Sequence, residues 1–263
     1  MKKYLILFQI AWKRTLLSRG ANILYLSIAF LNFFVSIGVW SVAYKNPNFR
    51  SQESFSTFIS YFLITMLMSR IVFSWIFDEI SGREIKLGEL SVSLLKPIPY
   101  FPLQLIQELP WRLQQFVMTL PIVLVLYFIY STQIFINPLM LMLAILIGIF
   151  GYFLSFIINI FFSSFTFWTD DNVGLGALWE ITSLLFTGIG MPIFFFPPLL
   201  QTISKFLPFQ YILYFPVTVA LGRLSNGEII LNFAYLLTWI GILGIVTKYL
   251  WNNGLKKFSG EGR

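Results

Sequence analysis

The sequence predicts an all-α membrane protein with six transmembrane helices. Hydrophobic residues make up 57% of the 263 residues and charged residues only 11%, and long uncharged apolar runs recur along the chain. A soluble domain carries about 25% charged residues, so this composition cannot cover a water-facing surface. A helix needs about 20 apolar residues to cross about 30 Å of hydrocarbon. The lipid bilayer is therefore the expected surroundings of the chain.

Six stretches reach that length, and polar or proline-containing breaks separate them. Arg70 is the only charged residue inside the second stretch, and Pro197-Pro198 end the fifth. Asp170-Asp171 precede the fifth stretch, and Ser131-Thr132-Gln133 separate the third from the fourth. We predict spans at 23–44, 54–77, 111–130, 138–162, 172–195 and 229–250.

The segment 196–221 is apolar but contains four prolines. Proline removes a helical hydrogen bond, and unpaired backbone groups are not tolerated against lipid. An uninterrupted lipid-facing helix is therefore not expected, and we predict two short re-entrant or interfacial helices between spans five and six.

The distribution of basic residues predicts the orientation. If the N-terminus lies inside, 13 of the 18 Lys and Arg residues fall on the inner side, four on the outer side, and Arg70 within the membrane. Loops rich in Lys and Arg stay in the cytoplasm, so both termini are predicted to be cytoplasmic. The basic residues flank apolar runs and form no single patch, which argues against nucleic acid as a partner.

The chain contains no Cys and no His. Disulfides, zinc sites of the usual kind and histidine-based catalytic triads are therefore excluded. An intramembrane enzyme, for example a lipid-modifying transferase or a protease, remains an alternative, as does a channel or scaffold without an energy source. Asp170-Asp171 could hold a metal ion, but we interpret the pair as a solvated turn and expect no metal and no cofactor in the chain.

Two amphipathic segments lie outside the predicted spans. Residues 2–19 combine an apolar arc with a basic one, which predicts an interfacial helix on the inner membrane surface among anionic lipids. Residues 78–101 form the one sizeable cytoplasmic loop, in which charges alternate with Ile and Leu. Its apolar side must be buried, either by the rest of the chain or by a partner protein.

This loop carries the run Arg83-Glu84-Ile85-Lys86-Leu87-Gly88-Glu89-Leu90, followed by Leu94-Leu95-Lys96-Pro97. The run resembles the signature loop of ABC type-2 exporter permeases. Residues 167–174 (FWTDDNVG) and 207–225 (LPFQYILYFPVTVALGRLS) resemble one bacterial subfamily of these permeases. The resemblance reaches WNNGLKKF at 251–258, so residues 1–263 are expected to be one ABC type-2 transmembrane domain.

In the permeases that the chain resembles, the loop between spans two and three is a coupling helix that rests on the ATPase. The resemblance implies a membrane-spanning permease subunit of a bacterial exporter, multi-pass in the cell membrane and without catalysis of its own. No G-x-x-x-x-G-K-[ST] motif is present, so ATP and Mg are expected in a separate cytoplasmic ATPase subunit. A second permease copy or a related permease is expected to complete the dimer. The residues implied in coupling are Arg83, Glu84, Gly88, Glu89, Leu90, Leu94, Leu95 and Pro97.

Arg70 lies within the second predicted span, and Glu180 lies within the fifth. A charge at the bilayer centre costs about 2.5 to 3.5 kcal/mol on insertion scales, so it needs a partner or a wet cavity. The two could pair and line the substrate path. Alternatively, Arg70 lies within two turns of Asp78 and extends to the inner interface, an interpretation that we slightly prefer.

Overall fold

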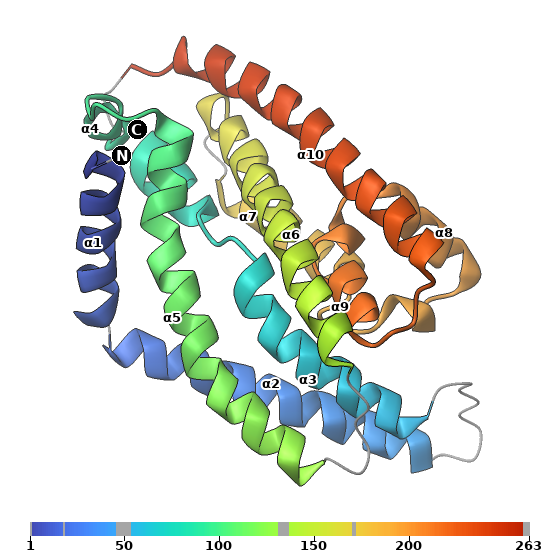
Figure 1. Cartoon of the computed structure of the whole chain (residues 1–263). Coiled ribbons are helices and arrows are strands. Elements are labelled where there is room, and N and C mark those ends of the chain that lie inside the picture. The colour runs from blue at the N-terminus through green and yellow to red at the C-terminus, as the bar shows by residue number, and fades with distance from the viewer. Residues whose placement is uncertain (1, 18, 46–53, 131–136, 170–171, 260–263) are drawn as a thin grey trace.

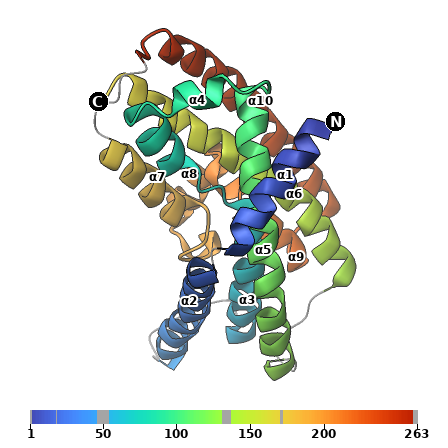
Figure 2. The same ribbon diagram turned by 90° about the vertical axis from the view of Figure 1, so that its left-hand side faces the viewer.

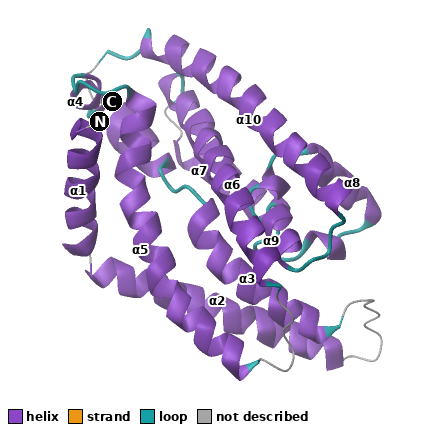
Figure 3. Cartoon of the chain, in the orientation of Figure 1, coloured by secondary structure: helices purple, strands orange, loops and turns teal. Residues whose placement is uncertain are grey.

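The computed structural model of the chain describes residues 2–17, 19–45, 54–130, 137–169 and 172–259, and every regular element in these ranges is a helix (Figure 3). The long helices are α1 (Lys2–Leu17), α2 (Arg19–Lys45), α3 (Phe55–Val72), α5 (Tyr100–Ile129), α6 (Pro138–Ser164), α7 (Asn172–Phe186) and α10 (Asn226–Leu255). The short ones are η1 (Glu79–Lys86), α4 (Leu90–Leu94), η3 (Phe165–Phe167), η4 (Ile193–Phe195), α8 (Pro198–Phe206), η5 (Phe209–Tyr211) and α9 (Tyr214–Ala220).

Five helices in the described residues are long and apolar enough to cross a membrane, namely α2, α3, α5, α6 and α10. The predicted fifth span is wrong as a single helix. Helix α7 has 15 residues, about 22 Å at 1.5 Å per residue, which is shorter than the hydrocarbon core. The chain turns at Gly188, where φ is +82°, and does not continue as a helix to Pro197. Asp170-Asp171 and Ser131-Thr132-Gln133, predicted as breaks, lie outside the described residues.

The predicted boundaries on both sides of the loop 78–101 also move. Helix α3 ends at Val72 instead of Phe77, and the four residues after Val72 are not helical. Helix α5 begins at Tyr100 instead of Trp111, and it continues through Pro110 and Pro121. The segment between α3 and α5 therefore covers residues 73–99, whereas the predicted loop covers residues 78–101.

Helix α3 forms the centre of the structure. All its residues from Phe58 to Met68 are buried, enclosed by α2, α5, α6 and α9. Helix α6 packs along α10 (Figure 1). Helices α2 and α10, in contrast, leave most of their apolar side chains exposed. Exposed apolar surface of this extent requires lipid or another protein chain against it.

One end of the molecule gathers the N-terminus, α4 and the C-terminal end of α10 (Figures 1 and 2). A second, smaller hydrophobic core lies here and joins η1 and α4 to α5, α6 and α10. In it, the Trp251 ring of α10 stacks on Tyr100 with ring centroids 4.4 Å apart. Helix α1 packs against α5. Its predicted position on the membrane surface stays a prediction.

The proline-containing segment after α7 forms short helices, as its sequence suggested. Helix α8 contacts η4 and η5, and η5 contacts α9 and α10. Helix α9 and the turn before it pack on α6 at Gly151, where an added Cβ would lie 2.6 Å from the carbonyl oxygen of Ile212. Only glycine allows this close approach between two backbones.

Candidate functional site

The loop between α3 and α5 is not the single amphipathic helix that the sequence pattern predicts. It consists of the π-helix η1, a turn at Gly88 and the one-turn helix α4. Gly88 has φ +77°, a conformation that glycine adopts without a steric penalty. Arg83 bridges the turn, since its Nη2 lies 2.7 Å from Glu89 Oε2 and its Nη1 lies 3.0 Å from Glu79 Oε1. The carboxylates of Glu89 and Glu79 raise the pKa of Arg83.

Glu84 holds the loop together from inside. Its buried carboxylate accepts hydrogen bonds from Ser93 Oγ at 2.6 Å and from Gln104 Nε2 at 2.8 Å, and a third from the Tyr100 hydroxyl. These donors come from α4 and from the first turns of α5, so one carboxylate connects η1 to both helices. Leu90 is also fully buried. Glu84 and Leu90, both implied in coupling by the resemblance, therefore face the chain's own interior.

The opposite side of the loop is apolar and exposed. We name it the loop face and define it by Leu87, Val92, Leu94 and Leu95. Leu95 is 85% exposed and Leu94 is 44% exposed. Leu87 and Val92 were not among the predicted coupling residues, because the pattern alone does not show which apolar positions turn outward.

The flanks of the loop face carry the remaining predicted residues. Arg83, Glu89 and Pro97 are exposed. The ammonium of Lys3, at the start of α1, donates to the carbonyl oxygen of Pro97 at 2.7 Å. The N-terminal helix is thus attached directly to the end of the loop.

The chain between α3 and η1 is unwound, and side chains of α6 satisfy its backbone groups. The Ser74 amide donates to Ser155 Oγ at 2.9 Å, and Asn159 Nδ2 donates to the Ser74 carbonyl at 3.1 Å. Ser163 Oγ donates to the carbonyl of Phe77 at 3.4 Å. Non-helical backbone is tolerated at membrane depth only where protein groups or water satisfy it in this way.

Glu108 of α5 completes this arrangement. Its carboxylate accepts from the Trp75 amide at 2.9 Å, from Ser74 Oγ at 2.8 Å and from the Tyr152 hydroxyl at 2.9 Å. Arg112 Nη2 lies 2.6 Å from the same carboxylate, and both side chains are buried. Glu108 thus joins α5, α6 and the unwound segment at one point.

Sequence reasoning missed the Glu108–Arg112 pair. Glu108 was not considered, and Arg112 was counted only among the basic residues of the inner side. The signal that could have found the pair is the spacing of four residues, with Glu N-terminal to Arg, which places the two side chains on one face of a helix.

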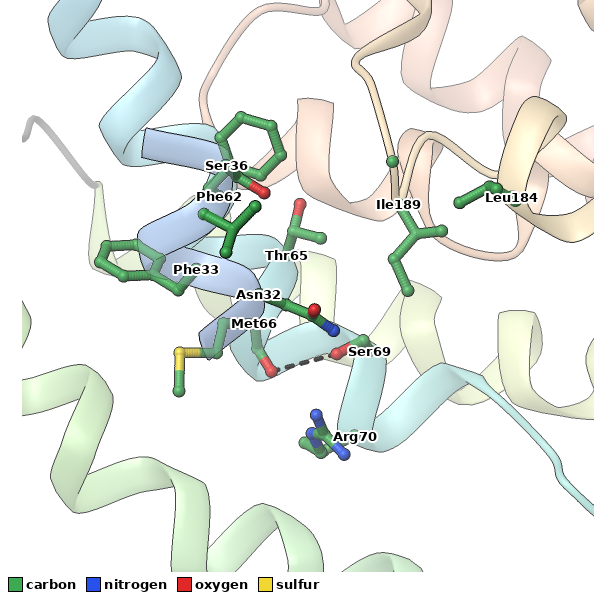
Figure 4. Close-up of a pocket in the computed structure, with 12 residues that line it drawn as sticks. Asn32, Phe33, Ser36, Phe62, Thr65, Met66, Ser69, Arg70, Leu184 and Ile189 are labelled. Atoms are coloured by element: carbon green, nitrogen blue, oxygen red, sulfur yellow. Dashed lines mark hydrogen bonds between the residues drawn. The ribbon is translucent and has the colours of Figure 1, made fainter. Parts of the chain in front are cut away.

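Arg70 lines a cavity of about 260 Å³ between α2, α3 and the end of α7 (Figure 4). The Arg70 side chain is partly buried, and its Nε has no hydrogen-bond partner within the described residues. Asn32 on α2 and Ser69 on α3 also line the cavity. In the part of the chain that the structure describes, no ion pair joins Arg70 to Glu180 or to Asp78. Glu180 is exposed on α7, one turn before Leu184 of the cavity wall.

A second, more polar cavity of about 490 Å³ lies between α1, η1 and α5. Arg14, Arg83 and Arg112 line it together with Glu79 and Glu108. Basic side chains therefore outnumber acidic ones in its wall. Arg112 belongs to this cavity, where it is paired with Glu108.

The fold and these sites define a multi-pass, all-helical membrane protein. A loop at one end of it exposes apolar side chains. A family model described as "ABC-2 family transporter protein" matches residues 16–262. The chain therefore belongs to the ABC-2 transporter family and is a membrane transport protein. No curated protein and no solved structure matches the chain.

Proposed function

We propose that the chain is the permease subunit of an ATP-driven exporter and that a separate cytoplasmic ATPase docks on the loop face. One observation carries the proposal: Leu94 and Leu95 are exposed although the interior of the same loop is already filled by Leu90 and Glu84. An apolar surface of this kind at the end of a membrane domain needs a partner to cover it. ATP and Mg are bound by that partner.

The proposal includes a second permease chain, identical or related. Helix α2 supports it, because almost none of its apolar stretch is buried within the chain. The two copies together form one translocation path in a bacterial cell membrane. The chain itself performs no reaction on the substrate.

The proposed topology has six crossings with both termini in the cytoplasm. Helix α6 ends near η1 and α7 begins there, whereas α10 begins at the other end of the molecule (Figure 1). The segment from α7 to α9 must therefore lead the chain from one end to the other. Helix α7 covers part of that crossing and the short helices re-enter from the outer face to complete it.

Cysteine labelling tests this topology, because the natural chain has no Cys. Thr202 of α8 and Gly227 of α10 are exposed near the proposed outer end, and Lys257 is exposed near the inner end. In intact cells, a membrane-impermeant maleimide is expected to label Thr202→Cys and Gly227→Cys but not Lys257→Cys. Lys257→Cys should be labelled only after permeabilisation. Labelling of Lys257→Cys in intact cells would contradict cytoplasmic termini.

The docking proposal is tested at Leu94 and Leu95. The double variant Leu94→Asp/Leu95→Asp places two charges in a contact that has to be dry, and each buried unpaired charge is costly. We expect affinity for the cognate ATPase to fall at least about tenfold, which corresponds to about 1.4 kcal/mol. The measurements are co-purification of the ATPase and transport-coupled ATP hydrolysis at matched expression. Leu94→Met/Leu95→Met, which keeps both positions apolar, is the matched control and should bind as the wild type does.

Leu90 is unsuitable for this test, since it is fully buried within the chain and a charge there would damage the loop itself. Correct insertion of the Asp variant is checked by its cysteine-labelling pattern. If the inserted Asp variant binds the ATPase with unchanged affinity, the loop face is not the docking surface.

A further inference from the structure

Arg70 contributes a positive charge to a cavity in which none of the described residues offers an acidic partner. Apart from Arg70, the described side chains that line the cavity are apolar or neutral polar. A charge inside a membrane domain is expensive unless an opposite charge or water balances it. The charge of Arg70 therefore requires an anion or water in the cavity to balance it.

The charges on the surrounding helices do not remove this requirement. Helix α2 has no charged residue between Arg19 and Lys45, and α3 contains only Arg70. Helix α5 adds Arg112, whose charge is balanced by Glu108. Helix α7 adds Glu180, which is exposed and lies outside the cavity lining. The guanidinium of Arg70 is left as the charge that an entering group would meet.

We propose that this cavity binds the phosphate or carboxylate group of an anionic amphiphile. The proposal rests on the permease assignment above and names the class of substrate for it. The planar guanidinium matches phosphate and carboxylate oxygens through paired N–H donors. Ser69 and Asn32 place further hydrogen-bonding groups in the same wall.

The size and the remaining lining favour an amphiphile over a free ion. A volume of about 260 Å³ is near the lower end of the range for small-molecule sites, so it accommodates a headgroup but not a whole lipid. Phe33, Phe62, Met66 and Leu184 supply apolar surface beside the charge. That surface suits the apolar portion adjoining a headgroup.

Binding measurements on the purified full-length permease test the proposal. The probes are dihexanoylphosphatidic acid, dihexanoylphosphatidylcholine and inorganic phosphate, and the readout is the dissociation constant from titration calorimetry. We expect the wild type to bind the phosphatidic acid about tenfold or more tightly than the phosphatidylcholine. Arg70→Gln should lose about tenfold or more of that affinity, since hydrogen bonds to charged groups are the strong ones. Arg70→Lys should retain an intermediate affinity, because lysine keeps the positive charge but lacks the paired N–H donors of the guanidinium.

Lys248→Gln is the matched control, since Lys248 is an exposed cation on α10 that does not line the cavity. It should bind the phosphatidic acid as the wild type does. Competition by inorganic phosphate at similar concentration would show that the site recognises the free ion, and overturn the amphiphile assignment. Equal affinity for both lipids, or unchanged binding by Arg70→Gln, would overturn the anion site itself.

A carboxylate of a second permease copy is the rival occupant of the cavity. In that case Arg70→Gln and Glu180→Gln would both dissociate the dimer and leave phosphatidic acid binding unchanged, which would also overturn the proposal. Failure here is distinguishable from failure of the docking proposal. Arg70→Gln is expected to keep wild-type ATPase affinity, whereas Leu94→Asp/Leu95→Asp is expected to keep wild-type lipid affinity.

Discussion

Replacing Glu108 with Ala is expected to destabilise the permease by about 3–5 kcal/mol, because it leaves the Arg112 guanidinium buried without its counter-charge. The same change removes the acceptor of the Trp75 amide and of two hydroxyl groups. The measurement is the melting temperature of the detergent-solubilised protein, which should fall by about 10 °C.

A double variant separates the cost of an unpaired charge from the loss of the other hydrogen bonds. Glu108→Leu/Arg112→Met removes both charges, and apolar replacements of buried ion pairs are often neutral or stabilising. We expect it to melt well above Glu108→Ala, although below the wild type, since Trp75 still lacks its acceptor. If Glu108→Ala melts within about 2 °C of the wild type, the pair does not organise the end of the molecule that carries the loop.

Gly151→Ala is the second change with a large expected effect. The new methyl group would lie 2.6 Å from the Ile212 carbonyl oxygen, a backbone atom that cannot rotate away. The contact between α6 and the segment before α9 must then open, at a cost of about 1–3 kcal/mol or more. We expect a lower melting temperature and increased protease cleavage between α8 and α10.

Gly148 offers a matched control one turn earlier on the same helix. A Cβ there would lie 2.7 Å from Met68 Cε, the end of a flexible side chain that can move. Gly148→Ala should therefore be tolerated with a smaller loss of stability. Equal effects of the two substitutions would show that the backbone contact at Gly151 has no special importance.

Hydrophobic length was sufficient to predict most of the membrane helices. Helices α2, α6 and α10 agree with the predicted ranges to within a few residues, because each contains a long apolar run bounded by polar or charged residues. The run after Asn172 is equally apolar, yet the chain turns at Gly188. That turn depends on Tyr61 of α3, whose hydroxyl donates to the Gly188 carbonyl at 2.6 Å, and a distant contact of this kind leaves no local pattern.

The candidate loop was predictable as a segment but not in its orientation. Periodicity marks Leu90, Leu94 and Leu95 as apolar, and it cannot say which of them turn inward. Leu90 turns inward because Tyr100 and Trp251, from α5 and α10, belong to the same core cluster. The role of Glu84 was likewise hidden, since its donors Ser93, Tyr100 and Gln104 are neutral residues with no charge pattern to reveal them.

The unwound residues after Val72 have a mechanical consequence. A continuous helix transmits rotation along its axis, whereas the four non-helical residues after Val72 can change their backbone dihedrals. Their polar groups are held by α6 and by Glu108, and Glu84 joins η1 to α5 through Gln104. A displacement of η1 is therefore expected to reach α5 through a hydrogen-bonded side-chain contact and α3 through non-helical backbone.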